Sequence, residues 1–182
     1  RRSWAGDAAP SRRITFGCIG MGTQMRGHLG ALLGRDEVEV LAVCDVDTTR
    51  RETALKRVRD AYAAKPGSAA TSCVAYNDFR DLLARKDIDA VLIATPDHWH
   101  AFIAIAAVKS GKDVYCEKPL THNIREAVEL VKAVRRTERV FQTGSQQRSS
   151  KEFRVASELV RNGVLGRVTA VNVSFGDPAK AY

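Results

Sequence analysis

A glycine-rich turn near the start of the sequence has the residue types that bind a phosphate group. The turn reads Gly20-Met21-Gly22-Thr23-Gln24. The first glycine permits a tight turn, the second lets a pyrophosphate approach the backbone, and the amides that open the following helix face the anion. We therefore take these five residues as candidates for cofactor binding. Met25 stands where the usual dinucleotide pattern has its third glycine, so the match is imperfect.

An acidic residue follows the second apolar run, at a spacing from the turn that is typical of dinucleotide sites. Asp45 is placed where a carboxylate accepts hydrogen bonds from the adenosine ribose hydroxyls. A carboxylate here repels the 2′-phosphate of NADP, so we expect NAD as the cofactor rather than NADP, although Arg50 nearby weakens that preference. The alternative is that Asp45 or Asp47 only caps a helix.

Two further loops carry polar side chains at the carboxyl ends of predicted strands, where ligands of parallel sheets bind. They read Thr95-Pro96-Asp97-His98-Trp99-His100 and Glu117-Lys118-Pro119. A lysine there can bond a substrate hydroxyl and stabilise its developing oxyanion, so we predict Lys118 as the catalytic residue. The alternative is an exposed ion pair with Glu117. No metal site is expected, because His98 and His100 point to different faces of a helix and no further ligand stands nearby in sequence.

The elements that position these residues alternate between strand and helix patterns. Apolar runs predict strands at 14–19, 38–44, 90–94, 113–116 and 140–143, with a weaker one at 73–76. Helix starts are indicated by Thr49 with Glu52, by Asn123 with Glu126, and by residues 149–152. The strand runs are continuously apolar, which is typical of strands covered on both faces. The pattern predicts an α/β fold with a doubly wound parallel sheet, the Rossmann architecture.

The last part of the sequence breaks this rhythm. Residues 168–175 alternate between apolar and polar with period two, which predicts a strand with one open face. We expect it to be the first strand of an antiparallel α+β domain that this chain lacks. The predicted organisation is a flexible leader at 1–12, a Rossmann domain at 13–163, and the start of a truncated substrate and oligomerisation domain at 164–182.

Together, these motifs resemble the amino-terminal domain of the Gfo/Idh/MocA oxidoreductases. The resemblance rests on the two glycines of the turn, Asp45, the loop from Thr95 to His100, and Glu117-Lys118-Pro119. It covers the chain from residue 13 to about residue 175. It implies a Rossmann domain that binds NAD or NADP, followed by an antiparallel domain that supplies substrate-binding residues and a catalytic His or Asp.

The resemblance also assigns roles to individual residues. It implies that Lys118 contacts the reacting hydroxyl and the nicotinamide, that Glu117 and His100 line the nicotinamide end, and that Thr95 and Asp97 lie along the cofactor. Arg148 is a candidate for contact with an anionic or hydroxyl-rich substrate. The bond between Lys118 and Pro119 is a candidate for the cis isomer.

The expected function is that of the nucleotide-binding domain of an NAD-dependent oxidoreductase, which transfers hydride between nicotinamide and a sugar or polyol hydroxyl. By itself the chain is expected to bind nucleotide and to turn over little or nothing, because the second catalytic group would lie in the other domain. Two alternatives stay open: a glycosidase that uses NAD in a transient oxidation, and a non-catalytic domain that binds a nucleotide or a partner protein. A methyltransferase is disfavoured, because Glu117-Lys118-Pro119 has no role there.

Composition narrows the choice of partners. The chain has 182 residues, 45% of them hydrophobic and 27% charged, which suits one globular core. The formal net charge is +8, but the basic residues are interleaved with acidic and apolar ones, so a nucleic-acid partner is not expected. No apolar run approaches the roughly 18 residues of a membrane span.

The cysteines and the first residues bear on the compartment. The four cysteines lie far apart, and Cys18, Cys44 and Cys116 fall in strand-like runs, so buried free thiols are expected. Free thiols and a supply of NAD favour the cytoplasm, whereas the arginine-rich start and the resemblance of residues 142–149 to an exported bacterial branch leave export open. The full-length enzyme is expected to be a homo-oligomer. The sequence does not name the sugar or the direction of the reaction.

Overall fold

A computed structural model describes residues 13–64 and 73–174 of the chain. The predicted leader at 1–12 lies outside the described residues. The chain divides into two compact units, residues 1–144 and residues 145–182, and each is described by itself.

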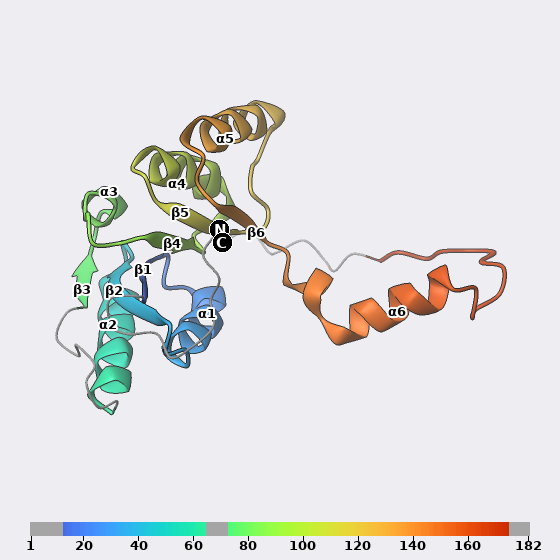
Figure 1. The fold of residues 1–182 in the computed structure, drawn as a ribbon, viewed down its shortest axis with the longest axis horizontal. Helices are drawn as coiled ribbons and strands as arrows, with labels where there is room; N and C mark the ends of the chain where they lie inside the picture. The colour runs from blue at the N-terminus through green and yellow to red at the C-terminus, as the bar shows by residue number, and fades with distance from the viewer. Residues whose placement is uncertain (1–12, 65–72, 175–182) are drawn as a thin grey trace. The chain divides into compact units, whose positions relative to one another are not determined.

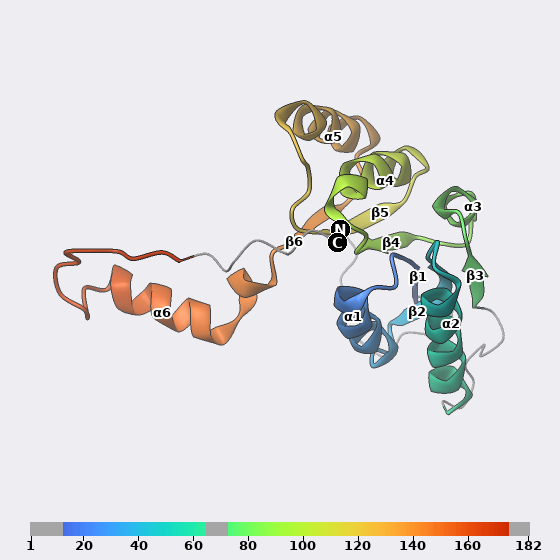
Figure 2. The same ribbon diagram turned by 180° about the vertical axis from the view of Figure 1, so that it is seen from behind.

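The first unit is a six-stranded parallel sheet with helices on both faces (Figures 1 and 2). The strands are β1 Ile14–Ile19, β2 Val38–Cys44, β3 Val74–Tyr76, β4 Ala90–Ile93, β5 Asp113–Glu117 and β6 Phe141–Gly144. The helices are α1 Thr23–Leu33, α2 Thr48–Ala63, α3 Phe79–Leu83, α4 Asp97–Lys109 and α5 Ile124–Thr137. The strand order is β3-β2-β1-β4-β5-β6, so the winding reverses between β1 and β4. The predicted doubly wound Rossmann fold is confirmed.

Each face of the sheet has its own hydrophobic core. On one face α1 and α2 pack against the sheet, with Met25, Leu29 and Val58 among the buried side chains. On the other face α3, α4 and α5 supply a second cluster. Neighbouring residues of β4 belong to different clusters, because Leu92 faces α1 and α2 while Ile93 faces the opposite side. Burial on both faces is the reason that the strand sequences are continuously apolar.

The helix starts lie close to the predicted ones, with one correction. The prediction that Thr49 and Glu52 form the capping box of the second helix is wrong, because α2 begins after Asp47. The Asp47 carboxylate accepts a hydrogen bond from the amide of Arg50 at 2.9 Å, while Thr49 already lies within the helix. At α5 the predicted cap is confirmed, since Asn123 Oδ1 accepts from the amide three residues on, at 2.9 Å.

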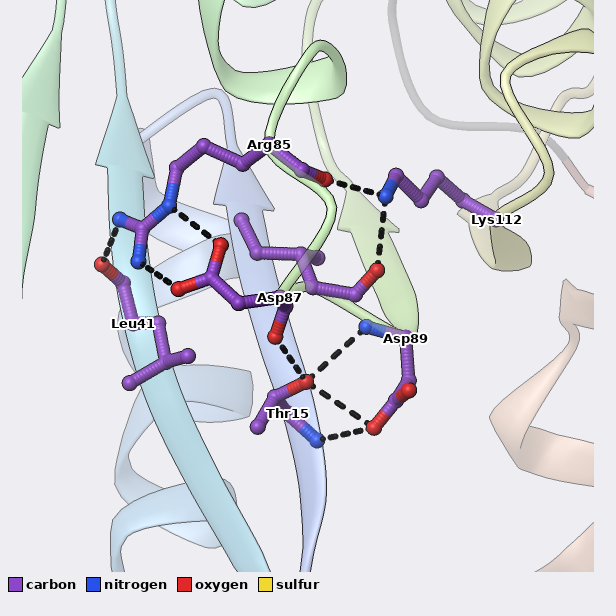
Figure 3. A network of polar contacts seen from close by, with 7 residues as sticks. Thr15, Leu41, Arg85, Asp87, Asp89 and Lys112 are labelled. Atoms are coloured by element: carbon purple, nitrogen blue, oxygen red, sulfur yellow. Dashed lines mark hydrogen bonds and ion pairs between the residues drawn. The ribbon is translucent and has the colours of Figure 1, made fainter.

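A polar network fixes the amino ends of the strands, at the edge of the sheet opposite the glycine turn (Figure 3). The Thr15 hydroxyl donates to the backbone oxygen of Asp87 at 2.6 Å. Arg85 forms an ion pair with the Asp87 carboxylate, with Nη2 and Oδ2 2.5 Å apart. The buried Lys112 ammonium donates to the backbone oxygens of Arg85 and Ile88. The loop between α3 and β4 is therefore held by side chains from two other strand ends.

The second unit contains a 3-10 helix at Gln146–Ser149 and the helix α6 at Lys151–Arg161. Ser150 caps α6, and Gly163 follows its end with φ of 70°, as the sequence predicted for a helix stop. The predicted last strand does not form over residues 168–174, which are exposed and unpaired. A strand needs a neighbour for its backbone N–H and C=O groups, and alternating side chains alone do not supply one. Residue 175 lies outside the described residues.

Two expectations from composition can be compared with the structure. All four cysteines are buried free thiols, which confirms the prediction for Cys18, Cys44 and Cys116. Burial raises the pKa of the Cys44 thiol to about 12, so this group is not a nucleophile at neutral pH. In the described ranges, no helix has both the length and the apolar character that crossing a membrane requires.

Candidate functional site

The turn between β1 and α1 requires glycine at Gly20 and leaves open space beside Gly22. Gly20 has φ of 86°, and a Cβ on it would lie 2.7 Å from the backbone nitrogen of Thr95, too close for any side chain. Gly22 is the N-cap of α1, without a side-chain cap, and no atom of the described residues lies within 4 Å of where its Cβ would be. The first amides of α1 therefore open onto space that an anion can fill.

Asp45 follows β2, and its carboxylate faces this turn. Oδ2 accepts a hydrogen bond from the amide of Met21 at 2.6 Å, and Oδ1 accepts from the amide of Asp47 at 2.8 Å. The two motifs that the sequence placed together are therefore in contact. The helix cap is Asp47 and not Asp45, so the capping role does not account for Asp45.

A cavity of about 500 Å³ lies along the carboxyl ends of β1, β2 and β4. The predicted site residues among its lining are Gly20, Gly22, Thr23, Gln24, Asp45 and Thr95. The Oγ1 of Thr95 is buried and has no hydrogen-bond partner among residues 13–64 and 73–174. An unpaired buried hydroxyl in a cavity wall is suited to bind a polar group of a ligand. Met21 differs from the others, because its side chain packs in the core and only its amide faces Asp45.

The loop after β5 carries Lys118 at the same edge of the sheet. The peptide bond between Lys118 and Pro119 is cis, as predicted. His100, with 1% of its surface exposed, lies between this loop and the loop after β4. Its Nδ1 is 2.7 Å from the backbone oxygen of Pro119, and its Nε2 is 2.8 Å from that of Thr95. His100 therefore joins the two loops, while its direct contact with a cofactor stays a prediction.

Glu117 is buried at the end of β5 and connects Lys118 to α1. Its Oε1 lies 2.6 Å from Nε2 of His28 and accepts a hydrogen bond from the side-chain nitrogen Nε2 of Gln24 at 3.3 Å. Its Oε2 accepts from the backbone amide of Lys118 at 3.2 Å. The predicted residues Gln24, Glu117 and Lys118 are therefore brought together, although they come from separate elements.

Two predicted residues lie apart from these contacts. Asp97 is exposed at the first position of α4, where a carboxylate suits the positive end of the helix dipole. Arg148 belongs to the 3-10 helix of the second unit. The contact of Asp97 with the cofactor and that of Arg148 with substrate both stay predictions.

Comparison with known proteins identifies the family. Residues 14–145, well over half of the chain, match the family model described as an oxidoreductase family with an NAD-binding Rossmann fold. The chain belongs to the Gfo/Idh/MocA oxidoreductase family. The resemblance that the motifs carried is thereby confirmed, together with NAD as the cofactor of the fold.

Relatives of this Gfo/Idh/MocA protein include glycosidases and dehydrogenases. A glycosyl hydrolase family 109 protein of Shewanella pealeana is 32% identical over 155 residues, which are 85% of this chain and 33% of that protein. The crystal structure of a myo-inositol 2-dehydrogenase from Lactobacillus plantarum has a TM-score of 0.72 at 26% identity, covering 86% of this chain and 43% of the other. The WlbA dehydrogenase of Chromobacterium violaceum, solved with NADH and UDP-GlcNAcA, has a TM-score of 0.72 at 25% identity and covers 90% and 44%. The chain thus spans between a third and a half of the length of these relatives.

The residues present fit the NAD of the Gfo/Idh/MocA family. The positive φ of Gly20 and the open space at Gly22 leave room for a pyrophosphate against the backbone. Asp45 supplies a carboxylate at the end of β2, and Thr95 supplies an unpaired hydroxyl in the wall. These features lie around one cavity that crosses the reversal of the strand order, where ligands of open α/β sheets bind.

Sequence reasoning did not assign a site role to four residues of this Gfo/Idh/MocA protein. Asn77 lines the cavity from the end of β3, where the rule that pointed to Thr95 also applies. Arg80 and Trp99 line it too, and the Arg80 guanidinium lies 4.6 Å from the ring centre of the neighbouring phenylalanine. His28 was also missed, although its spacing of four residues from Gln24 puts both on one face of a helix.

Proposed function

We propose that the protein is an NAD-dependent oxidoreductase that transfers hydride between nicotinamide and a hydroxyl-bearing carbon of a sugar or polyol, and that this chain is its nucleotide-binding domain. The observation that carries the proposal is the cavity bounded by Gly20, Gly22, Asp45 and the unpaired Thr95 hydroxyl, with Lys118 at the same edge of the sheet. Similarity to a myo-inositol 2-dehydrogenase and to a dehydrogenase solved with UDP-GlcNAcA supports a sugar or polyol as substrate.

In this proposal the residues of the site bind the cofactor, orient the substrate hydroxyl and assist the loss of its proton. Gly20, Gly22, Asp45 and Thr95 would hold the NAD, which would supply the hydride acceptor for oxidation of the carbinol carbon to a carbonyl. Lys118 bonds the substrate hydroxyl, fixes its orientation and stabilises the oxygen as its proton leaves. We expect the base that takes this proton to come from the part of the relatives' length that the chain does not span. The chain itself should therefore bind nucleotide and show little turnover.

Asp45 gives the first test, because its carboxylate is placed to distinguish NAD from NADP. We expect calorimetric titration to show tighter binding of NADH than of NADPH. Asp45→Ala should weaken NADH binding by about 10-fold or more, the usual cost of losing a hydrogen bond to a charged group. It should also reduce the difference in affinity between NADH and NADPH. Asp60→Ala removes an exposed carboxylate further along α2 and serves as the matched control. Equal binding of both cofactors by the wild type would overturn the preference for NAD.

A second candidate function is glycoside cleavage with a transient oxidation by bound NAD. It is favoured by the 32% identity to a glycosyl hydrolase family 109 protein. The two functions differ in their net redox change. Full-length protein that forms NADH from a polyol would support the dehydrogenase, whereas cleavage of an aryl glycoside without accumulation of NADH would support the glycosidase.

A further inference from the structure

We infer that His28 is a positioning residue for the nicotinamide end of the site. It holds the carboxyl group of Glu117, and through that group the backbone of Lys118, in the arrangement that binds the nicotinamide of the cofactor. The inference rests on the proposed function, because it assumes that Lys118 and Glu117 face the nicotinamide. In this inference His28 contributes to nicotinamide binding without itself contacting the cofactor or the substrate.

The first step is the pairing of His28 with Glu117. Only 5% of the Glu117 side chain is exposed, and its Oε1 lies 2.6 Å from Nε2 of His28, whose side chain is 17% exposed. The ring can donate this bond as a neutral imidazole with its proton on Nε2, or as an imidazolium that forms an ion pair. Short bonds between a basic ring and a carboxylate are among the stronger ones in proteins. His28 therefore determines where the carboxyl group points.

The second step is the connection from Glu117 to Lys118. While Oε1 is held by His28, Oε2 accepts from the backbone amide of Lys118 at 3.2 Å. The carboxyl group thus bridges a helix and the residue on which the proposed reaction depends. A rotation of the carboxyl group would release the amide of Lys118, which begins the cis peptide bond to Pro119.

The third step links this bridge to the phosphate end of the site. Gln24 also donates to Oε1 of Glu117, at 3.3 Å, and lies one turn before His28 on the same face of α1. The same helix begins at Gly22, where its amides open onto the cavity. Since a helix moves as a rigid element, the position that α1 takes on a bound pyrophosphate is transmitted through Gln24 and His28 to the loop of Lys118.

Packing around the pair leaves the carboxyl group little freedom to move. The ring of Tyr115 meets the His28 ring edge to face, with centroids 5.4 Å apart. On the other side Gly144 is in close contact with Glu117, because a Cβ at Gly144 would lie 2.9 Å from its Cα and Cδ atoms. Loss of the His28 ring would leave a confined carboxyl group without one of its donors, which is costly for a buried polar group.

The experiment compares two ligands that differ only by the nicotinamide. The chain and its variants are titrated with NADH and with ADP-ribose by calorimetry. His28→Ala should weaken NADH binding by about 10-fold, the size expected for the loss of one hydrogen bond to a charged group, and should leave ADP-ribose binding unchanged. His28→Gln keeps an amide donor and should recover most of the NADH affinity. His28→Phe keeps a ring against Tyr115 but removes the donor, so it should act in the same direction as His28→Ala, and it serves if His28→Ala does not fold.

Two further measurements separate positioning from stability. Tyr62→Phe removes a buried hydrogen bond to the amide of Val40 on the α2 side of the sheet, and it should lower Tm without changing the ratio of NADH to ADP-ribose affinity. In the ligand-free protein, His28→Ala should shift the amide resonance of Lys118. If the wild type binds neither ligand, the proposed function fails. If it binds both, and His28→Ala weakens both equally, weakens neither or leaves the Lys118 resonance in place, the inference about His28 is overturned.

Discussion

At the scale of single residues, the site depends on particular backbone conformations and hydrogen bonds. Gly20 adopts φ of 86° directly beside the backbone of Thr95, and the Asp45 carboxylate accepts a hydrogen bond from the amide of Met21. These features could be anticipated from the sequence, because glycine spacing and an acidic strand end have direct backbone consequences. The pairing of His28 with Glu117 could not, since it depends on the packing of side chains 89 residues apart.

The strain at Gly20 gives a prediction about stability. Gly20→Ala should lower the free energy of unfolding by about 1–3 kcal/mol, because φ is positive and the new Cβ would meet the backbone near Thr95. Gly27→Ala is the matched control on α1, where no atom of the described part of the chain lies within 4 Å of the new Cβ, and it should raise the free energy of unfolding by about 0.5–1 kcal/mol. Urea unfolding of both variants measures the difference. Equal changes in the free energy of unfolding for the two variants would show that the turn accepts a Cβ at position 20 without strain.

The role of Lys118 gives a prediction about catalysis. In the full-length protein, Lys118→Ala should reduce the rate of hydride transfer by about 100-fold or more, because the hydroxyl loses its orienting group. NADH affinity should change much less. Lys109→Ala, an exposed lysine in α4, provides the control. A variant of Lys118 with undiminished rate would remove this residue from the proposed mechanism.

At the scale of elements, strands could be predicted well where burial on both faces imposes a continuous apolar run. Each end of the six predicted strands of the sheet agrees with the structure to within one residue. The start of α2 was less certain, because Asp47 and Thr49 are both good capping residues and only the backbone decides between them. The strand expected at 168–175 does not form over residues 168–174. Its alternating pattern could not decide this, because a strand also needs a neighbouring strand to pair with.

The start of α2 gives a prediction that separates the two caps. Asp47→Ala should lower the free energy of unfolding by about 1 kcal/mol, because the amide of Arg50 loses its acceptor. Thr49→Ala should change it little, since Thr49 lies inside the helix. Thermal or urea unfolding of the two variants decides the question. A larger loss for Thr49→Ala would restore the capping box predicted from the sequence.

At the scale of the whole molecule, the parallel sheet separates two ends with different tasks. The carboxyl ends of the strands carry the cavity and Lys118, which could be predicted because all strands point the same way. The amino ends carry the network of Thr15, Arg85, Asp87 and Lys112, which the sequence did not indicate (Figure 3). Residues in that network are distant from the cavity, so their substitution should affect stability rather than binding.

The ion pair of this network makes stability depend on pH. Hydrogen bonds from Arg85 lower the pKa of Asp87, so its contribution to stability is present above the usual Asp range and is lost as the pH falls below about 4. We expect Asp87→Asn to lower the urea midpoint at neutral pH and to reduce the further loss in acid, while NADH affinity stays unchanged. Asp60→Asn, in an exposed pair with Lys56, should do neither. If Asp87→Asn keeps the full acid dependence of the wild type, another carboxylate is responsible, and if it weakens NADH binding, the two ends of the sheet are coupled.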